Sequence, residues 1–223
     1  MPHVHRLTRL GFVNAYLVEE DDGLVLIDTM IGGSAARIRT EAQRLGRPII
    51  RIALTHAHGD HIGSLDALHS ALPDAEVLIS ARDARLLAKD LRPLESEPPD
   101  ARIRGSLPGA RTTPSRLLEA GDRIGSLEVV PSPGHTPGHV AFLDTRDRTL
   151  YCGDAYTTLG AVATSAKGHW YFPLAAMVTW HAPTALESAR ALRALHPARL
   201  ASGHGKVVES PGPLMDAAIA RGA

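Results

Sequence analysis

The sequence predicts an α/β fold in which two mixed β-sheets are flanked by helices, an αββα sandwich. Short apolar, β-branched runs occur in both halves of the chain, and segments with helical spacing of apolar residues accompany them. Sheets bury their apolar faces against another layer, so strands in both halves with helices outside predict two central sheets. At 223 residues, we expect a single domain, 1–223, large enough to bury a core.

The first half begins with a predicted hairpin and a helix. Two apolar runs, 15–18 and 24–28, flank an acidic turn at 19–23. A helix is predicted from Ser34, a preferred N-cap residue, to Gly46, because the apolar residues between them recur at helical spacing.

A buried strand at 49–54 follows, and then a short helix at 64–70. The next elements are a strand at 77–80 and a helix at 81–89. From 90 to 116 the pattern dissolves into Pro, Gly, Arg and Glu. We expect this stretch to be a surface excursion or a mobile loop, and whether it acts as a lid is left open.

The second half repeats the pattern from about residue 122. Its strands carry β-branched and aromatic residues, and its main helix keeps leucine and alanine on one face. The predicted elements are strands at 127–130, 140–143, 149–152 and 199–204, and helices at 183–195 and 213–220.

Composition excludes several classes of function. Lysine plus arginine (24) equals aspartate plus glutamate (24), so no net field favours nucleic acid or an anionic membrane. No apolar run is long enough to cross a bilayer, and residues 1–10 lack the apolar core of a signal peptide. The single Cys152 forbids an internal disulfide and is expected to be a buried, inert thiol. A cytoplasmic protein is therefore expected.

One short segment carries most of the chemistry. Residues 55–61 read Thr-His-Ala-His-Gly-Asp-His, directly after the strand at 49–54. Each neutral imidazole offers a lone pair to a metal, and the carboxylate adds an oxygen donor and a proton acceptor. Exposed loop histidines are the alternative for such a tract. The cluster predicts a metal site at the end of a strand.

Three more residues of ligand type lie at strand ends. His135 lies between two strands, in Ser-Pro-Gly-His-Thr-Pro-Gly-His at 132–139. Asp154 follows the strand at 149–152, and His204 is flanked by glycines after another strand. Four strand ends with ligand-type residues beside glycine predict one site along one sheet edge.

With these motifs, the chain from about Asn14 to Gly205 resembles the metallo-β-lactamase-fold hydrolase superfamily, in the branch of glyoxalase II and lactonases. The resemblance rests on the HxHxDH motif and the order of the later ligands. It implies a first metal on His56, His58 and His135, a second on Asp60, His61 and His204, and Asp154 as the bridge between them.

The resemblance also sorts the neighbouring residues. His61 fits the glyoxalase II and lactonase branch, and His58 argues against the flavodiiron oxidoreductases, which carry a glutamate there. The resemblance makes Asp28 an orienting residue and not a ligand, and Thr55 is expected to share that role. His139 resembles a structural or orienting histidine.

The implied reaction is hydrolysis. Two divalent metals sharing a hydroxide would attack an ester, lactone, thioester or amide carbonyl. Asp60 is the expected catalytic carboxylate, and Tyr156, two residues after Asp154, is a candidate hydrogen-bond donor to the oxyanion. Zinc suits the nitrogen and oxygen donors best, and iron, manganese, cobalt or nickel also fit.

Aromatic residues gather between 155 and 181, although the whole chain is only 4% aromatic. The alternatives are a hydrophobic flap packed on the core and a substrate pocket wall or lid over the metals. The candidate pocket residues are Lys167, His169, Trp170, Tyr171 and Phe172.

Other readings compete with the dinuclear hydrolase. A persulfide dioxygenase would use one iron on His56, His135 and Asp154, and the full second ligand set argues against it. The short segment after His204 has few basic residues, which disfavours glutathione thioesters, and superfamily nucleases need an extra domain and a basic surface. A non-catalytic binding module is disfavoured by the intact ligand set. We expect a small-molecule substrate, with its identity and the oligomeric state left open.

Overall fold

The computed structural model describes residues 3–223 and divides the chain into two compact units. The first unit comprises Met1–Asp90 and Ser106–Leu118, and the second comprises Leu91–Gly105 and Glu119–Ala223. Each unit contains one large mixed sheet with its own helices, which confirms the predicted α/β class with two mixed sheets.

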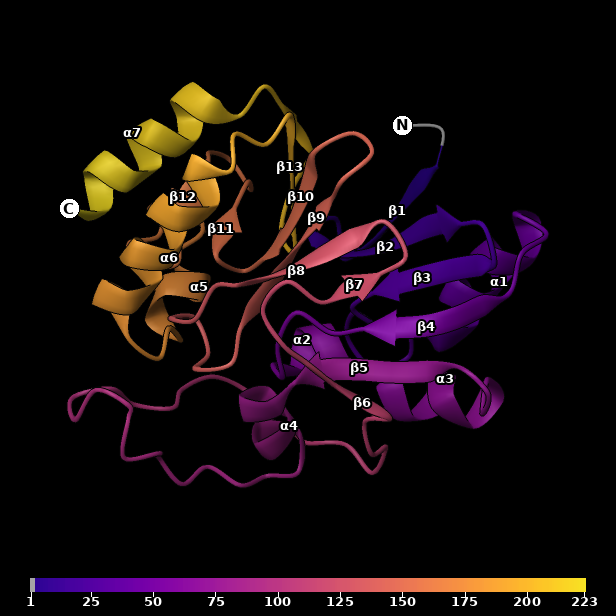
Figure 1. Cartoon of the computed structure of the whole chain (residues 1–223). Coiled ribbons are helices and arrows are strands. Elements are labelled where there is room, and N and C mark those ends of the chain that lie inside the picture. Colours follow the sequence, from indigo (N-terminus) through magenta and orange to yellow (C-terminus); the bar gives the residue numbers. More distant parts are fainter. Residues whose placement is uncertain (1–2) are drawn as a thin grey trace. The chain divides into compact units, whose positions relative to one another are not determined.

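The first unit contains a six-stranded sheet in the order β1-β2-β3-β4-β5-β6 (Figure 1). Strands β1 to β3 pair antiparallel and strands β3 to β6 pair parallel, so the sheet is mixed. Its strands are β1 (Val4–Arg9), β2 (Val13–Glu20), β3 (Gly23–Ile27), β4 (Ile49–Ala53), β5 (Glu76–Ser80) and β6 (Arg116–Leu118).

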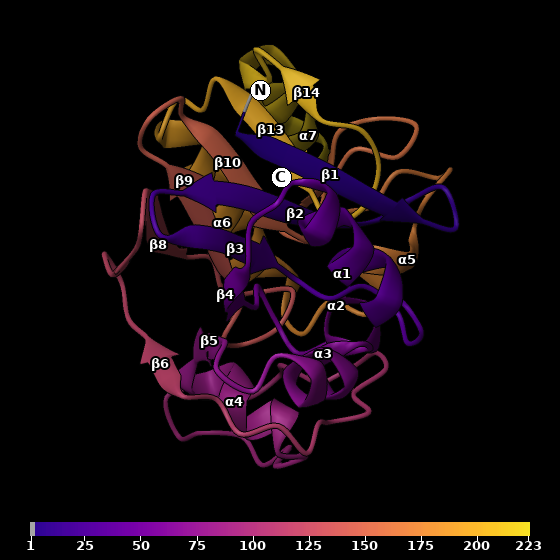
Figure 2. The ribbon, with the colours of Figure 1, turned by 90° about the vertical axis from the view of Figure 1, so that its right-hand side faces the viewer.

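Four helices belong to the first unit. They are α1 (Ala35–Arg44), α2 (Gly59–Ile62), α3 (Leu65–Ala71) and α4 (Ala81–Leu87). Helices α1 and α3 lie side by side on one face of the sheet (Figure 2). Helix α1 turns Ile38 and Ala42 to the core, as its helical spacing predicts.

The register of β3 and β4 brings two polar segments to one edge of this sheet. The strands are parallel with Ile27 opposite Ala53, so the chain leaves both strands in the same direction. Asp28 follows β3 and donates its backbone N–H to the carbonyl of Ala53 at 3.0 Å. The segment from Thr55 onward therefore starts beside Asp28.

The second unit contains a six-stranded sheet in the order β14-β13-β10-β9-β8-β7 and the small pair β11-β12. Only β10 and β13 pair parallel, so this sheet is also mixed. Its strands are β7 (Arg123–Ile124), β8 (Leu127–Pro131), β9 (Val140–Asp144), β10 (Thr149–Gly153), β11 (Tyr156–Thr157), β12 (Ala163–Thr164), β13 (Arg199–Ser202) and β14 (Val208–Glu209).

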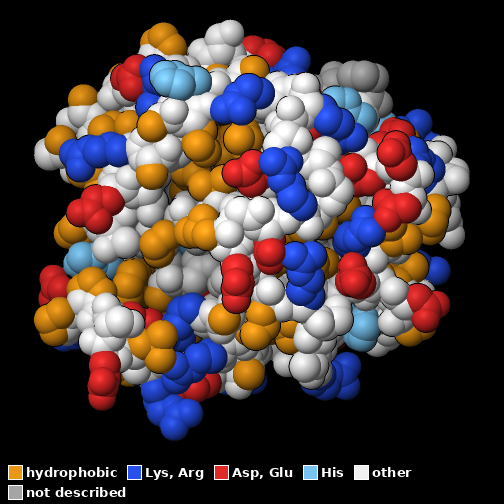
Figure 3. Space-filling model, in the orientation of Figure 1, with side chains coloured by type: hydrophobic (Ala, Val, Ile, Leu, Met, Phe, Trp, Pro, Cys, Tyr) orange, Lys and Arg blue, Asp and Glu red, His pale blue; other side chains and the backbone are white. Residues whose placement is uncertain are grey.

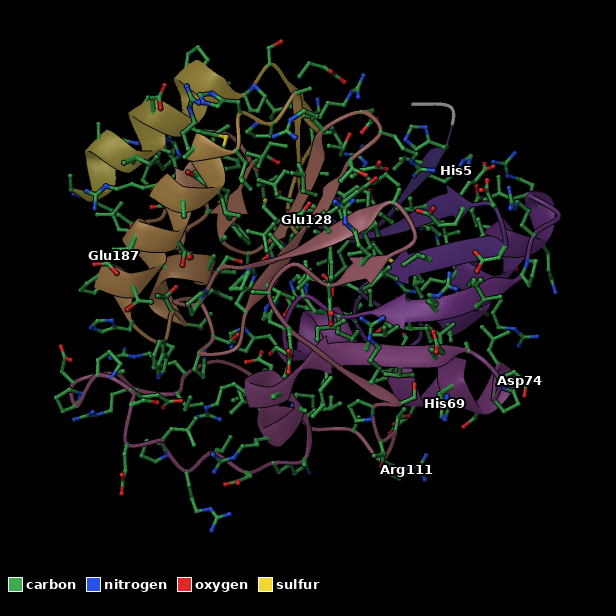
Figure 4. All side chains as sticks on the ribbon, viewed as in Figure 1. His5, His69, Asp74, Arg111, Glu128 and Glu187 are labelled. Atoms are coloured by element: carbon green, nitrogen blue, oxygen red, sulfur yellow. The ribbon has the colours of Figure 1, made fainter. Side chains whose placement is uncertain are left out.

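Helices cover one face of the second sheet. They are α5 (Leu174–Met177), α6 (Ala182–Ala194) and α7 (Gly212–Gly222). Leu192 of α6 and Met215 of α7 are fully buried in one core with Leu150 and Leu200 of the sheet. Glu187, on the other face of α6, points away from this core (Figure 4). The single-faced pattern of α6 matches its predicted amphipathic spacing.

Strand directions gather three loops at one edge of the second sheet. Strands β8 and β10 both run antiparallel to β9, so their carboxyl ends lie at the same edge. Strand β13 is parallel to β10, and the backbone N–H of Gly203 donates to the carbonyl of Gly153 at 2.9 Å. The segments 132–139, 154–155 and 203–205 thus leave the sheet together.

The stretch between α4 and β6 is irregular. Residues 88–115, all of which the structure describes, contain neither helix nor strand. Its first part lies in the second unit, where the Arg102 N–H donates to the carbonyl of Trp180 at 3.1 Å. Its later part lies in the first unit, where the Asp66 carboxylate accepts the N–H groups of Arg111 and Thr112.

The visible surface mixes both signs of charge. Figure 3 shows acidic and basic side chains interspersed over most of the face that it presents. No helix of residues 3–223 combines the length and apolarity that a membrane span requires.

Candidate functional site

The histidine-rich segment of the first unit leaves the end of β4 as an extended loop. His58 is extended (φ −70°, ψ 149°) and caps α2, whose first turn contains Asp60 and His61. The ring centroids of His56 and His61 lie 4.0 Å apart, and those of His56 and His58 lie 4.9 Å apart. All three imidazoles are buried, and the Asp60 side chain retains 38% of its exposure. The first unit therefore brings four predicted ligands together.

Asp28 is the organising carboxylate of this loop. Its Oδ2 accepts a hydrogen bond from Nδ1 of His61 at 2.7 Å, and its Oδ1 accepts the Thr55 backbone N–H at 2.8 Å. The residue is buried and has a left-handed backbone (φ 58°), which a short polar side chain tolerates best. Its predicted orienting role agrees with these contacts.

The Thr55 hydroxyl links the Asp28 carboxylate to the ring of His56 through two hydrogen bonds. Its hydroxyl donates to Oδ2 of Asp28 at 2.8 Å, so its oxygen is left to accept the proton on Nδ1 of His56 at 3.0 Å. Both His56 and His61 then carry the proton on Nδ1 and present Nε2 as the lone-pair donor. This is the tautomer that a metal ligand requires when its other nitrogen is hydrogen-bonded.

The second unit brings three predicted ligands together at its sheet edge. One oxygen of Asp154 lies 3.2 Å from Nε2 of His204 and 3.6 Å from Nε2 of His135. The three residues are buried and reach this point from the ends of β8, β10 and β13. A carboxylate between two imidazoles matches the arrangement that the sequence predicts within this unit.

Thr179 orients His135. The Thr179 hydroxyl lies 2.8 Å from each of the carbonyl oxygens of Ser165 and Ala175, so its proton goes to a carbonyl. Its oxygen then accepts the Nδ1 proton of His135 at 3.2 Å. The next residue, Trp180, donates its backbone N–H to the His135 carbonyl at 2.9 Å. His135 is thus held both by its ring and by its main chain.

His139 holds the main chain of Asp154 through a hydrogen bond. Its Nε2 accepts the backbone N–H of Asp154 at 3.1 Å, so Nδ1 carries the proton and donates to Ser132 Oγ at 2.8 Å. Both nitrogens are used inside the protein. The structure agrees with the expected structural role.

Gly205, next to His204, lies where the backbone of Thr158 approaches closely. A Cβ on Gly205 would lie 2.4 Å from the Thr158 carbonyl carbon, and its φ is +111°. The Thr158 N–H donates to the His204 carbonyl at 2.8 Å across this contact. Only glycine fits there without a shift of the backbone.

Tyr156 is a correction to the sequence-based prediction. Its hydroxyl donates to the Ala189 carbonyl at 2.7 Å, and its ring is fully buried in the core that β10 shares with α6. Burial raises the pKa of this phenol, so it stays protonated. A phenol whose only proton is committed to a core carbonyl is not an oxyanion donor, so the prediction for Tyr156 is wrong. Its separation of two residues from Asp154 did not define the direction of the side chain.

Cys152 lies in the same core. It is fully buried, and burial raises the pKa of its thiol. The thiol is therefore protonated and inert, as the sequence predicts.

The candidate pocket residues divide by exposure. Lys167 is exposed, His169 is half-buried, and Trp170 and Tyr171 are strongly exposed. Phe172 is buried, and its ring centroid lies 5.1 Å from that of His204. Within the second unit, Phe172 therefore packs directly on a predicted ligand.

The donor sets fit divalent metal ions. Buried neutral imidazoles with Nε2 as the donor and carboxylate oxygens are the ligand types that zinc and similar ions take. His56, His61 and His135 each have Nδ1 bonded to an oxygen partner, which is the support that metal-binding histidines normally have. The residues present therefore suit a metal site.

Sequence reasoning missed three contributors to these ligand loops. They are Thr179, Ser132 and Asp83, which accepts the Ala57 N–H at 2.9 Å. Thr179 lies 44 residues from its partner and Asp83 lies 26 residues from its own, and neither belongs to a recognisable motif. The folded chain alone reveals them.

Two relatives match nearly the whole chain. Uncharacterized protein YobT of Bacillus subtilis (strain 168) is 46% identical over 208 residues, covering 93% of this chain and 89% of that protein. Probable metallo-hydrolase YflN of the same organism is 31% identical over 223 residues, covering 91% and 83%. The name of YflN supports a metal-dependent hydrolase, and that of YobT states no activity.

Solved structures give the same fold. TTHA1623 in a di-iron-bound form matches with a TM-score of 0.67 and 29% identity, covering 93% of this chain and 94% of that one. The B3 metallo-beta-lactamase BLEG-1 matches with a TM-score of 0.71 and 24% identity, covering 96% of each chain. The family model described as the metallo-beta-lactamase superfamily matches residues 8–204. This chain belongs to the metallo-beta-lactamase superfamily.

Proposed function

We propose that this chain is a dinuclear metal-dependent hydrolase that acts on an ester, lactone, thioester or amide carbonyl. The observation that carries the proposal is the orientation of the ligand histidines. Asp28 fixes His61 directly and His56 through Thr55, and Thr179 fixes His135. A hydrogen bond at Nδ1 fixes the tautomer and the ring orientation of a histidine, so that Nε2 can bind a metal ion.

The proposed ligand assignment follows the family. His56, His58 and His135 would hold one ion, Asp60, His61 and His204 would hold the other, and Asp154 would bridge them. The Asp154 oxygen near Nε2 of both His135 and His204 supports that bridging role. Zinc is the ion that we propose, and the related TTHA1623, solved in a di-iron-bound form, makes iron the first alternative.

When bound, divalent ions lower the pKa of water toward neutrality and polarise a carbonyl oxygen. The chain supplies the proton chemistry. Asp60 is the most exposed of the ligand-type residues in its loop and lies at the first turn of α2, where a carboxylate is favoured. We assign to it the orientation of the attacking water and the acceptance of its proton. The imidazoles of His56, His58 and His61 around it are buried.

The substrate is proposed to be a small molecule that contacts Lys167, His169, Trp170, Tyr171 and Phe172. The equal numbers of acidic and basic residues support a substrate that is not a nucleic acid. A cytoplasmic location is part of the proposal, and the single buried Cys152 supports a reducing compartment.

The test is metal analysis combined with a carbonyl-substrate screen. Protein purified without chelator is expected to contain two metal ions per chain and to hydrolyse at least one ester, lactone or thioester. Asp60→Asn should lower kcat by about 10²- to 10⁴-fold, the usual contribution of a general base, with unchanged melting temperature. Asp74→Asn, at an exposed position after α3 (Figure 4), is the matched control and should retain full activity.

Two results would contradict the proposal. Near-normal kcat in a fully metallated Asp60→Asn variant would remove Asp60 from catalysis. A single iron per chain, with dioxygen consumption on a persulfide, would replace the hydrolase by a dioxygenase.

A further inference from the structure

A tight turn in the second unit carries two exposed aromatic side chains at its tip. The Phe172 N–H donates to the His169 carbonyl at 2.9 Å, which closes the turn. Trp170 and Tyr171, between them, are 82% and 61% exposed, and their rings meet edge to face at 5.6 Å. Exposed apolar side chains that gather in one patch often mark a binding site.

The apolar surface continues into α5. Leu174 and Met177 are 54% and 64% exposed and lie one helical turn apart. Among residues 3–223, nine large apolar side chains are exposed, and four of them fall within residues 170–177. We call residues 170–177 the aromatic segment. Its concentration of exposed apolar area points to an occupant.

The aromatic segment is anchored beside a ligand. Phe172, in its middle, packs on the ring of His204 at 5.1 Å. Tyr171 lies over Gly160, where a Cβ would come within 2.9 Å of the Tyr171 ring. The exposed side chains of the segment therefore flank a buried ring that contacts a residue proposed to hold metal, which favours substrate over a remote partner.

We infer that the aromatic segment binds an apolar acyl, alkyl or aryl group of the substrate, next to the carbonyl that is hydrolysed. This inference rests on the proposed function and narrows its substrate class to carbonyl compounds with a large apolar substituent. The contacts lie away from the reacting atoms, so they act on binding and appear mainly in KM.

The test is a series of p-nitrophenyl esters from acetate to octanoate with the metallated protein. Wild-type kcat/KM is expected to rise about tenfold or more along the series, since one methylene in a hydrophobic pocket is worth about 10-fold or more. Trp170→Ala and Tyr171→Ala should flatten the rise through KM, so that kcat/KM falls several-fold more for octanoate than for acetate. Leu214→Ala, at another exposed apolar position of the second unit, is the matched control.

The outcomes separate the inference from the proposed function. Absence of metal-dependent hydrolysis along the whole series and for lactones and thioesters would overturn the proposed function. Hydrolysis with no dependence on chain length, in wild type and variants alike, would overturn only the inference. Sedimentation of the protein with phospholipid vesicles, lost in Trp170→Ala without a change in chain-length preference, would reassign the segment to a lipid surface.

A second, independent observation concerns the backbone of the ligand loop in the first unit. The Ala57 N–H donates to a carboxylate oxygen of Asp83 at 2.9 Å, and the Gly59 N–H donates to the Ser106 carbonyl at 2.9 Å. These amides alternate with His56, His58 and Asp60. The loop is thus held from outside through the residues between its ligands.

The surroundings of Asp83 fix its position for this contact. It is fully buried near the start of α4, and its own N–H donates to Ser80 Oγ at 3.2 Å. The carboxylate reaches the Ala57 amide from a different strand connection, 26 residues further along the chain. A buried carboxylate that accepts a backbone N–H fixes that peptide group strongly.

We propose that Asp83 is a positioning residue for the metal-ligand loop. It does not contact the ions but sets the peptide plane between His56 and His58. Asp83→Ala should weaken metal binding by about 10- to 100-fold, the usual effect of removing a residue that orients ligands, and should shift the visible bands of the cobalt-loaded protein. Asp83→Asn keeps an acceptor oxygen and should restore both.

Ser80→Ala is the control, because it removes the cap of α4 and leaves the Ala57 contact in place. Equal loss of cobalt affinity in Ser80→Ala and Asp83→Ala, at equal loss of stability, would make Asp83 merely structural. Wild-type cobalt affinity and spectrum in Asp83→Ala would overturn the proposal outright. If Asp83→Ala does not fold, Asp83→Ser, which is too short to reach the amide, provides the same comparison.

Discussion

His61 donates the proton on its Nδ1 to Asp28 at 2.7 Å, across 33 residues of sequence. The same carboxylate oxygen accepts the Thr55 hydroxyl, so one buried group fixes the tautomers of two candidate ligands. The left-handed backbone of Asp28 aims the carboxylate at both. A small change at this residue should therefore affect two histidines together.

Asp28→Ala should weaken metal binding by about 10- to 100-fold, because both imidazoles lose their orienting acceptor. The measurement is competition with a chromophoric chelator. Asp22→Ala, at an exposed acidic turn in the same unit, is the control and should bind metal normally. Unchanged affinity in Asp28→Ala would show that the loop holds its histidines without the carboxylate.

Gly134→Ala should destabilise the second unit strongly. The new Cβ would lie 2.3 Å from the Cα of Ala185, at a φ of +136°. Overpacking against a backbone costs about 1–3 kcal/mol or more, and the strained φ adds to it. Gly33→Ala, with φ +80° and open space around the Cβ, isolates the strain and should cost only about 1 kcal/mol. Urea unfolding of both variants gives the comparison.

The stabilisation from Asp66 should depend on pH. Burial raises the pKa of this carboxyl, but hydrogen bonds from Thr112 and Arg111 outweigh it and hold the pKa below its ordinary value of 3.8. A lowered folded pKa means that the stabilisation is fully present above the unfolded value and is lost as the pH falls through the folded value. The difference in unfolding free energy between wild type and Asp66→Asn should therefore be constant at neutral pH and shrink below about pH 4. A difference that persists at pH 2 would contradict the assignment.

His139→Ala should leave the metal content intact at saturating metal and lower the stability. The variant strands the buried N–H of Asp154, which costs about 1–3 kcal/mol. Elemental analysis and thermal unfolding measure the two effects, and His196→Ala, at an exposed position, is the control. Loss of one metal ion in His139→Ala would make the residue a ligand.

The sequence was sufficient for the elements with strong periodicity. The side-chain pattern alone predicts the buried run at 49–54 and the helix around Ile38. Strand β1 was not predicted, because only Val4 and Leu7 of its residues are buried and polar side chains separate them. Strand β6 is three residues long and depends on its parallel neighbour β5.

Side-chain direction was the other limit. Ligand types beside glycine at strand ends could be found in the sequence, because rigid strands aim their ends consistently. The partners that orient them could not, since Thr179 and Asp83 approach from distant segments through single hydrogen bonds. Tyr156 is a second example of this limit. Its spacing from Asp154 suggested a place in the site, but packing placed its ring in the core.

The backbone of the ligand loop is fixed by residues outside the loop. Asp83 and Ser106 accept hydrogen bonds from backbone N–H groups of the loop. Neither hydrogen bond involves the side-chain donor atoms of positions 56, 58 and 60. Donor side chains at those positions can therefore be exchanged while the loop keeps its path. A single substitution at one of these three positions is therefore expected to change the donor atoms offered to a metal ion and to leave both backbone hydrogen bonds in place.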